Sequence, residues 1–151
     1  MPHIDVTDRA RVHAEVQHFF ARQIRLLNSA DVEGFAATFT EDGRMHHASR
    51  DDDVRGHAAI VESLRANFAQ HQGVVPRHWF DKLLIEPSGE DTVTVSYYAL
   101  VTLTHADGSV TVLPTCLVDD VLVVRDGQLF TKSRSITRDD LLLVPSARRA
   151  S

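Results

Sequence analysis

The chain has 151 residues, enough for one domain with a substantial core and an internal cavity. Its formal charge is −5 and it has only two lysines, Lys82 and Lys132, so it lacks a basic stripe that could neutralise a row of phosphates. Its single cysteine, Cys116, cannot form an internal disulfide, which fits a reducing cytoplasm. No apolar stretch approaches the roughly 18 residues of a membrane-spanning helix. We therefore expect a cytoplasmic, single-domain protein that binds neither nucleic acid nor membrane.

The first 43 residues have the periodicity of helices. A break at Asn28–Asp31 separates a long helix, with Thr7 as its candidate N-cap, from a short one in which Phe35 and Phe39 share a face. A turn at Glu41–Gly43 ends the short helix. The apolar stripe of the long helix has spacings of three and four: Val12, Val16, Phe19, Gln23 or Ile24, and Leu27.

The next segment predicts a short strand and a third helix. Residues Arg44–Ala48 have strand character, and the polar segment Ser49–Arg55 is typical of a loop. Gly56 then precedes a helix that ends before Gly73. Its buried face repeats every four residues: Ile60, Leu64 and Phe68.

From Pro76 onward the chain has the β-branched, alternating pattern of strands. Turn signals at Pro87-Ser88-Gly89, Asp107-Gly108 and Asp126-Gly127 divide it into four segments, and Asp-Gly is a strong hairpin signal. Pro114 and Asp119-Asp120 predict a bulge or bend. The last three segments should form an antiparallel meander: Val93–His105, Val110–Val124 and Gln128–Ile136.

The predicted order of elements is ααβα followed by ββββ, which places the chain in the α+β class. A sheet of such long strands with its helices on one side must curl to cover its apolar face, and the curl leaves a conical pocket. The tail from about Asp139, residues 139–151, is expected to be peripheral. The whole chain, residues 1–151, is predicted to be one domain.

This order, with the phrase Leu26–Phe35 leading to Phe39–Gly43, resembles the nuclear transport factor 2-like superfamily. More narrowly, the chain resembles its SnoaL-like branch, which includes scytalone dehydratase, bile-acid dehydratase, hexachlorocyclohexane dehydrochlorinase and polyketide cyclases. The resemblance covers nearly the whole chain. It implies a cone-shaped barrel, in which three N-terminal helices pack on a curved mixed or antiparallel sheet around a central pocket.

The resemblance also implies candidate catalytic residues. The family's dehydratases and dehydrochlorinase use an aspartate at the end of the first helix, a histidine at the start of the long strand after the third helix, and often an arginine near the end of the final strand. By flanking pattern His78 and Arg134 match the last two, whereas Asn28 stands at the aspartate position. A carboxylate would make the imidazole a stronger base, whereas asparagine can orient the ring but carries no charge. Asp31 is a candidate to supply the missing acid.

Two pairs of neighbouring residues add further candidates. His46 and His47 point to opposite faces of a short strand, so at most one can enter the pocket, and the position of the shuttling aspartate in ketosteroid isomerase favours His47 as a second acid or base. Tyr97 and Tyr98 also point to opposite faces. We expect Tyr97 to point inward, where its phenol could donate a hydrogen bond to an oxyanion.

Each candidate also has a purely structural interpretation. His78 could be a strand histidine bonded to backbone or water, and Arg134 could form a surface ion pair. His47 could be solvated beside a polar loop, and Tyr97 could simply pack in the sheet. The residues expected to shape the apolar pocket or the core behind it are Met45, Phe68, Trp79, Phe80, Ala99 and Val101.

No metal and no cofactor are expected. The nine histidines lack paired ligand spacing, and neither a glycine-rich phosphate loop nor a nucleophile elbow is present. The first functional hypothesis is therefore a cofactor-independent lyase, isomerase or cyclase that acts on a small hydrophobic or polyketide-like molecule by proton abstraction, with dehydration favoured. The alternative is a non-catalytic binding or assembly module, like the β subunit of a dioxygenase. Either would form a homodimer or homotrimer, because an open sheet presents a face or edge to cover.

Overall fold

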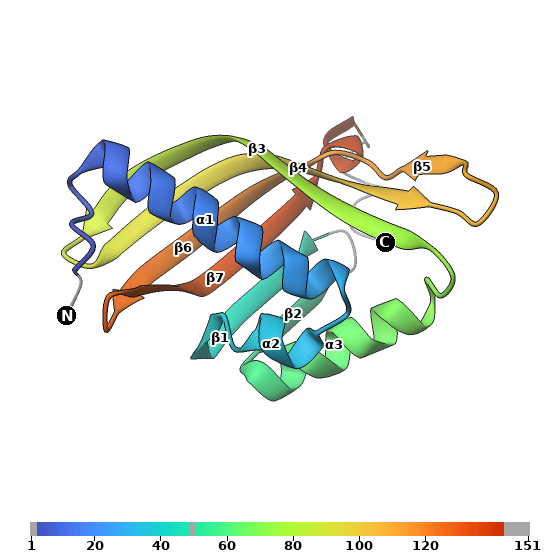
Figure 1. The fold of residues 1–151 in the computed structure, drawn as a ribbon, viewed down its shortest axis with the longest axis horizontal. Helices are drawn as coiled ribbons and strands as arrows, with labels where there is room; N and C mark the ends of the chain where they lie inside the picture. The colour runs from blue at the N-terminus through green and yellow to red at the C-terminus, as the bar shows by residue number, and fades with distance from the viewer. Residues whose placement is uncertain (1–2, 49–50, 144–151) are drawn as a thin grey trace.

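The computed structural model describes residues 3–48 and 51–143. Its three helices, α1 (Arg9–Asn28), α2 (Val32–Ala36) and α3 (His57–Ala69), pack on one curved, open sheet. Figure 1 shows α1 lying across the long strands, with α2 and α3 beside β1 and β2 at one end. The predicted α+β class is thus confirmed. The strands are β1 (Phe39–His47), β2 (Asp52–Arg55), β3 (Val75–Gly89), β4 (Thr92–Thr104), β5 (Val110–Val112), β6 (Cys116–Arg125) and β7 (Gln128–Arg138).

The sheet is mixed, with the strand order β2-β1-β7-β6-β4-β3, while β5 pairs with β4. The predicted meander is confirmed, because β4, β6 and β7 are successive antiparallel neighbours. Parallel pairing of β1 with β7 joins the N-terminal half of the chain to the meander. This pairing brings the helices over the concave face of the sheet.

Helix α1 begins one residue later than it would with the predicted N-cap, Thr7. Asp8, not Thr7, is the N-cap: its carboxylate accepts a hydrogen bond from the backbone N–H of Arg11 at 3.1 Å. Thr7 instead donates from both its backbone and its hydroxyl to the carboxylate of Asp5. The predicted apolar stripe of α1 is confirmed, and both Gln23 and Ile24 are buried in it.

Two predictions around β1 were wrong. Phe39 and Glu41–Gly43 lie in β1 rather than at the end of a helix, because α2 stops at Ala36 and the chain then pairs with β7. The predicted loop Ser49–Arg55 contains β2, which pairs antiparallel with β1, while residues 49–50 lie outside the described residues. Both segments become strands through pairing with a neighbour, which local pattern alone does not indicate.

The remaining differences lie in the meander. The turn signal Pro87-Ser88-Gly89 falls inside the end of β3, and the segment Val110–Val124 divides at Pro114 into β5 and β6, as a proline bend requires. Asp119 and Asp120 pair in regular register with β7, and the register shift comes after Val121. The bulge predicted at the two aspartates is therefore displaced.

The core consists of two clusters. One lies between α1 and strands β4, β6 and β7; the other lies between the end of α1, α2, α3 and β1. Phe80 of β3 packs against both. Beyond β7, Asp139–Leu143 forms a short 3-10 helix, and the rest of the predicted tail lies outside the described residues. Within the part of the chain that is described, no helix combines the length and apolarity needed to cross a bilayer.

Candidate active site

A cavity of about 1010 Å³ opens between the end of α1, α3 and the concave face of the sheet. Its size is that of a small-molecule site. Most residues predicted for a pocket do line it: Asn28, Met45, His47, Phe68, His78, Phe80, Ala99, Val101 and Arg134. Three predicted residues, Asp31, Trp79 and Tyr97, do not line it.

His78 and Asn28 meet at the wall of this cavity. Asn28 ends α1 and His78 lies near the start of β3, and the Oδ1 atom of Asn28 is 2.7 Å from Nδ1 of His78. A carbonyl oxygen can only accept, so this contact requires the hydrogen on Nδ1. The tautomer leaves the lone pair of Nε2 available as a base.

The environment keeps the His78 ring neutral. Burial, and secondarily the positive charge of Arg134, lower the pKa of His78 from 6.5 to about 4. At neutral pH the imidazole is therefore unprotonated and ready to accept a proton. Burial and Arg134 thus make it a weak base, and Asn28 supplies orientation without a charge that would stabilise the imidazolium.

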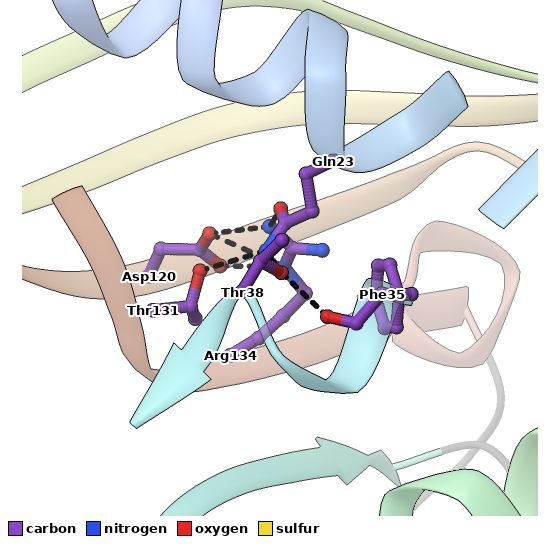
Figure 2. A network of polar contacts seen from close by, with 6 residues as sticks. All are labelled: Gln23, Phe35, Thr38, Asp120, Thr131 and Arg134. Atoms are coloured by element: carbon purple, nitrogen blue, oxygen red, sulfur yellow. Dashed lines mark hydrogen bonds and ion pairs between the residues drawn. The ribbon is translucent and has the colours of Figure 1, made fainter. Parts of the chain in front are cut away.

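Arg134 is held in a buried network rather than in a surface ion pair (Figure 2). Its Nε donates to Asp120 Oδ1 at 3.0 Å and its Nη2 to Asp120 Oδ2 at 2.8 Å. Nη2 also donates to Gln23 Oε1 at 2.6 Å. The Arg134 side chain is only 3% exposed. Burial alone would lower the pKa of Arg134, but the Asp120 carboxylate outweighs burial and raises it, so the guanidinium stays charged.

Gln23 connects this ion pair to the start of β1 and to β7. Its Nε2 donates to Thr38 Oγ1 at 2.8 Å and to Thr131 Oγ1 at 3.0 Å. The Thr38 hydroxyl in turn donates to the backbone carbonyl of Phe35 at 2.6 Å, which Figure 2 also shows. One amide thus uses its oxygen on the arginine and both hydrogens on hydroxyls, which satisfies all its buried polar atoms.

Aromatic rings enclose the other side of the guanidinium. The Cζ atom of Arg134 lies 5.6 Å from the ring centre of Phe20, 5.8 Å from that of Phe39 and 5.4 Å from that of Phe80. Such contacts with the ring faces attract a cation. Arg134 is therefore fixed in position while it contributes to the cavity wall.

Tyr97 faces inward as predicted, and Tyr98 is 61% exposed. Tyr97 packs behind the cavity wall, with ring centres 4.6 Å from Phe80 and 5.0 Å from Phe20. Its Oη is buried and makes no hydrogen bond within the described residues, although Asp120 and Arg134 are near enough to act on its charge. Burial raises the pKa of Tyr97 well above 10, so its phenol stays protonated.

Asp31 and Trp79 have other roles than predicted. Asp31 is the exposed N-cap of α2, where its Oδ1 accepts a hydrogen bond from the Gly34 N–H at 2.9 Å, and it does not line the cavity as a substitute acid. Trp79 is 56% exposed and donates from its indole Nε1 to Thr102 Oγ1 at 3.0 Å. As the extended neighbour of His78, Trp79 must point to the opposite face of the sheet.

The two histidines of β1 separate as the alternation requires. His47 lines the cavity, whereas His46 lies 3.4 Å from the hydroxyl of Ser135 through its Nδ1. Across residues 3–48 and 51–143, no group of three or more histidine, cysteine or acidic side chains is placed to hold a metal ion.

Sequence reasoning missed Asp120 and Gln23. Gln23 interrupts an otherwise apolar helical stripe, and Asp120 alternates with Val118 and Leu122 on a buried strand face. A polar residue at a core position of this kind indicates a buried partner. That signal was present in both segments.

Comparisons with known proteins agree with this fold. A family model described as a SnoaL-like domain matches residues 8–135. The structure of Aln2, from a Streptomyces species, is 42% identical, with 87% of this chain and 93% of that chain covered and a TM-score of 0.81. A Catenulispora acidiphila protein solved in complex with S-DNPA is 40% identical, with 89% and 98% covered and a TM-score of 0.79.

A third similar structure is ActVI-ORFA from Streptomyces coelicolor. It is 36% identical, with 85% of this chain and 98% of that chain covered and a TM-score of 0.80. No curated protein matches the chain.

Proposed function

The chain belongs to the SnoaL-like family, and we propose that it is a cofactor-independent lyase, isomerase or cyclase acting on a small hydrophobic or polycyclic, polyketide-like molecule. Dehydration is the reaction that we favour. The observation that carries the proposal is a neutral histidine on the cavity wall, with Nδ1 held by Asn28 and a fixed arginine contributing to the same cavity. The ligand that names the Catenulispora structure supports a small molecule as the occupant here.

In this mechanism Nε2 of His78 removes a proton from the carbon next to a substrate carbonyl. The electrons of the broken C–H bond form an enolate, and Arg134 stabilises its negative oxygen. Loss of the β-hydroxyl then forms the carbon–carbon double bond, and the proton on His78 leaves with the hydroxyl as water. A β-hydroxy ketone supplies the acidic hydrogen and the leaving group next to each other.

The low pKa of His78 restricts the substrates of this mechanism. A base whose conjugate acid has a pKa of about 4 can remove only a proton that is already acidic or whose enolate is strongly stabilised. Arg134 lowers the basicity of His78 but also stabilises the enolate, so its net effect favours substrates whose negative charge develops on oxygen. Aromatic β-hydroxy ketones and 1,3-diketones meet this condition.

His47 is proposed as a second acid or base, because it lines the same cavity as His78 from the opposite strand β1. In a dehydration it would relay the proton taken up by His78 to the leaving hydroxyl, so that one water is released and both histidines return to their starting state. The protonated phenol of Tyr97 lies behind Phe80 and is proposed to support Arg134 rather than to meet the substrate.

The proposal is tested by incubating wild type, His78→Ala and His13→Ala with β-hydroxy ketones and aromatic polyketides in deuterated water. His13 is an exposed residue of α1, so its replacement is the matched control. Mass spectrometry should show water loss or deuterium uptake with wild type and His13→Ala and neither with His78→Ala. Turnover that survives His78→Ala would exclude this histidine as the base.

A non-catalytic binding or assembly module is the second candidate, and Asn28 favours it. An uncharged partner leaves His78 a poor base, as a protein selected only for binding would tolerate. If the β-hydroxy ketones or aromatic polyketides bind in the cavity and none reacts, and if His78→Ala alters only stability or affinity, the binding module becomes the better interpretation.

We also propose that the protein forms a homodimer or homotrimer through the convex face of the sheet. This face presents the exposed side chains of Trp79, Leu84, Tyr98 and Leu117. Apolar groups so concentrated favour burial against a second surface. Light scattering of wild type and of a Leu84→Glu, Tyr98→Glu variant should show the oligomer in the first protein and a monomer in the second. The cytoplasmic location stays a prediction.

A further inference from the structure

The part of the cavity wall that the structure describes has no acidic side chain, although the chain has more acidic than basic residues. The protein has 21 aspartates and glutamates against 16 lysines and arginines, yet no aspartate or glutamate is among the described residues that line the cavity. The cations on that wall are Arg65, Arg134 and Arg138, and three histidines, among them the neutral His78, also line it. Their acidic partners, Glu33, Asp120 and Asp140, stand outside the lining. Such a one-signed concave surface favours an anionic ligand.

Two of the arginines lie on one strand and face the same way. In β7 the side chains of Arg134, Ile136 and Arg138 are two residues apart and all line the cavity. Four residues of extended strand separate the two arginine backbones by roughly 13 Å. The row therefore presents a cation, an apolar surface and a second cation along one wall.

The two ends of this row differ in depth. The Arg134 side chain is 3% exposed and lies at the closed end, whereas that of Arg138 is 36% exposed and lies at the open end. Arg138 donates from Nε and Nη2 to Asp140 at 2.9 Å and 2.5 Å. The hydrogen bonds to Asp120, Gln23 and Asp140 use only Nε and Nη2 of the two arginines and leave Nη1 outside these contacts. Each guanidinium thus keeps donors for a ligand.

We propose that the substrate is a fused-ring carboxylic acid that lies along β7, with its carboxylate on Arg138 and its reacting carbonyl at Arg134 and His78. The inference rests on the proposed function for the reacting end. Its ring body lies over Ile136, which accounts for the apolar residue between the two cations. A guanidinium can donate two parallel hydrogen bonds to a carboxylate. At the open end of the cavity the carboxylate keeps part of its hydration, so the free-energy cost of removing it from water is low.

Binding of two matched probes tests the proposal without any turnover. The probes are anthraquinone-2-carboxylic acid and its methyl ester, which share a ring system and ring carbonyls and differ in charge. Calorimetry should show that wild type binds the acid about tenfold more tightly than the ester. Because only binding is measured, a failure of the catalytic proposal leaves this result unaffected, and His78→Ala should keep the preference for the acid.

Two variants of opposite effect locate the carboxylate. Arg138→Gln should abolish the preference for the acid by weakening acid binding about tenfold and leaving ester binding unchanged. Asp140→Asn removes the competing carboxylate and should tighten acid binding severalfold. Arg22→Gln, at an exposed position of α1 outside the cavity lining, is the matched control and should change neither affinity, and Arg65→Gln tests the cation on α3.

Three outcomes would overturn the proposal. Equal affinity of wild type for acid and ester, or no binding of either probe, would show that the cavity does not select a fused-ring acid. A preference abolished by Arg65→Gln and kept by Arg138→Gln would move the carboxylate to α3. Thermal melting of each variant separates loss of binding from loss of folding.

Discussion

Replacing Asn28 by aspartate places a charge beside His78 with little change of shape. The Oδ1 atom already lies 2.7 Å from Nδ1, so the new carboxylate would accept the same hydrogen bond. For charge centres about 4 Å apart and an effective dielectric of about 20, the attraction to an imidazolium is about 4 kcal/mol, or about 3 pKa units. Burying the carboxylate reduces this value, and we expect a rise of about 1 to 3 units. The pKa of His78 should therefore move from about 4 to between roughly 5 and 7.

The assay is a titration of the histidine ring signals by nuclear magnetic resonance, with the His78 signal assigned from its loss in His78→Gln. The signal of exposed His13 should be the same in wild type and Asn28→Asp. Asn28→Ala is the matched variant that removes the hydrogen bond without adding charge, so its His78 should not gain basicity. If wild-type His78 already titrates near its usual pKa of 6.5, or if Asn28→Asp leaves it unmoved, the electrostatic account of this site is wrong.

Three further predictions concern stability. Asp120→Asn leaves the guanidinium of Arg134 buried without its counter-charge and should cost about 3 to 5 kcal/mol in urea unfolding; a cost below about 1 kcal/mol would show that the pair is not buried in solution. Gln23→Leu should cost about 1 to 3 kcal/mol in the same assay, because it leaves buried groups unpaired, whereas exposed Gln17→Leu should stay within about 0.5 kcal/mol. The pKa of His78 is lower in the folded state than the unfolded value near 6.5, so protonation of this ring favours the unfolded state. The stability that neutral His78 contributes is therefore fully present above about pH 6.5 and is lost as pH falls to about 4. The loss amounts to about 3 kcal/mol, and His78→Gln should abolish it, so identical acid unfolding curves for the two proteins would contradict the low pKa.

Local sequence signals correctly predicted most helices and strands. The segments that were mispredicted are those whose structure depends on pairing with strands distant in the sequence. The stripe of α1 and the Asp-Gly turns of the meander are written in neighbouring residues, so these features were confirmed. Phe39 and β2 were mispredicted because their strand structure depends on β7 and β1, which lie elsewhere in the sequence.

The candidate site was predictable only in part. The alternation of side chains along a strand correctly predicted that Tyr97 is buried and Tyr98 exposed. The family pattern indicated both His78 and Asn28, which the structure places in contact. The prediction that Trp79 shapes the pocket was wrong, because the aromatic character of the residue was given more weight than its position beside His78. The partners of Arg134 lie 14 and 111 residues away, on β6 and α1, and no local pattern reports such separations.

The amide of Gln23 has a consequence for redesign of this protein. It connects α1, the turn before β1, β7 and the guanidinium of Arg134, so a change on the buried face of α1 is transmitted directly to the proposed reacting end of the cavity. By contrast, the segment 70–74 after α3, which also lines the cavity, is largely exposed. A mutant library aimed at new substrates should therefore vary this exposed segment and leave Gln23 and its partners intact, since the proposed chemistry and the folding depend on the same few hydrogen bonds.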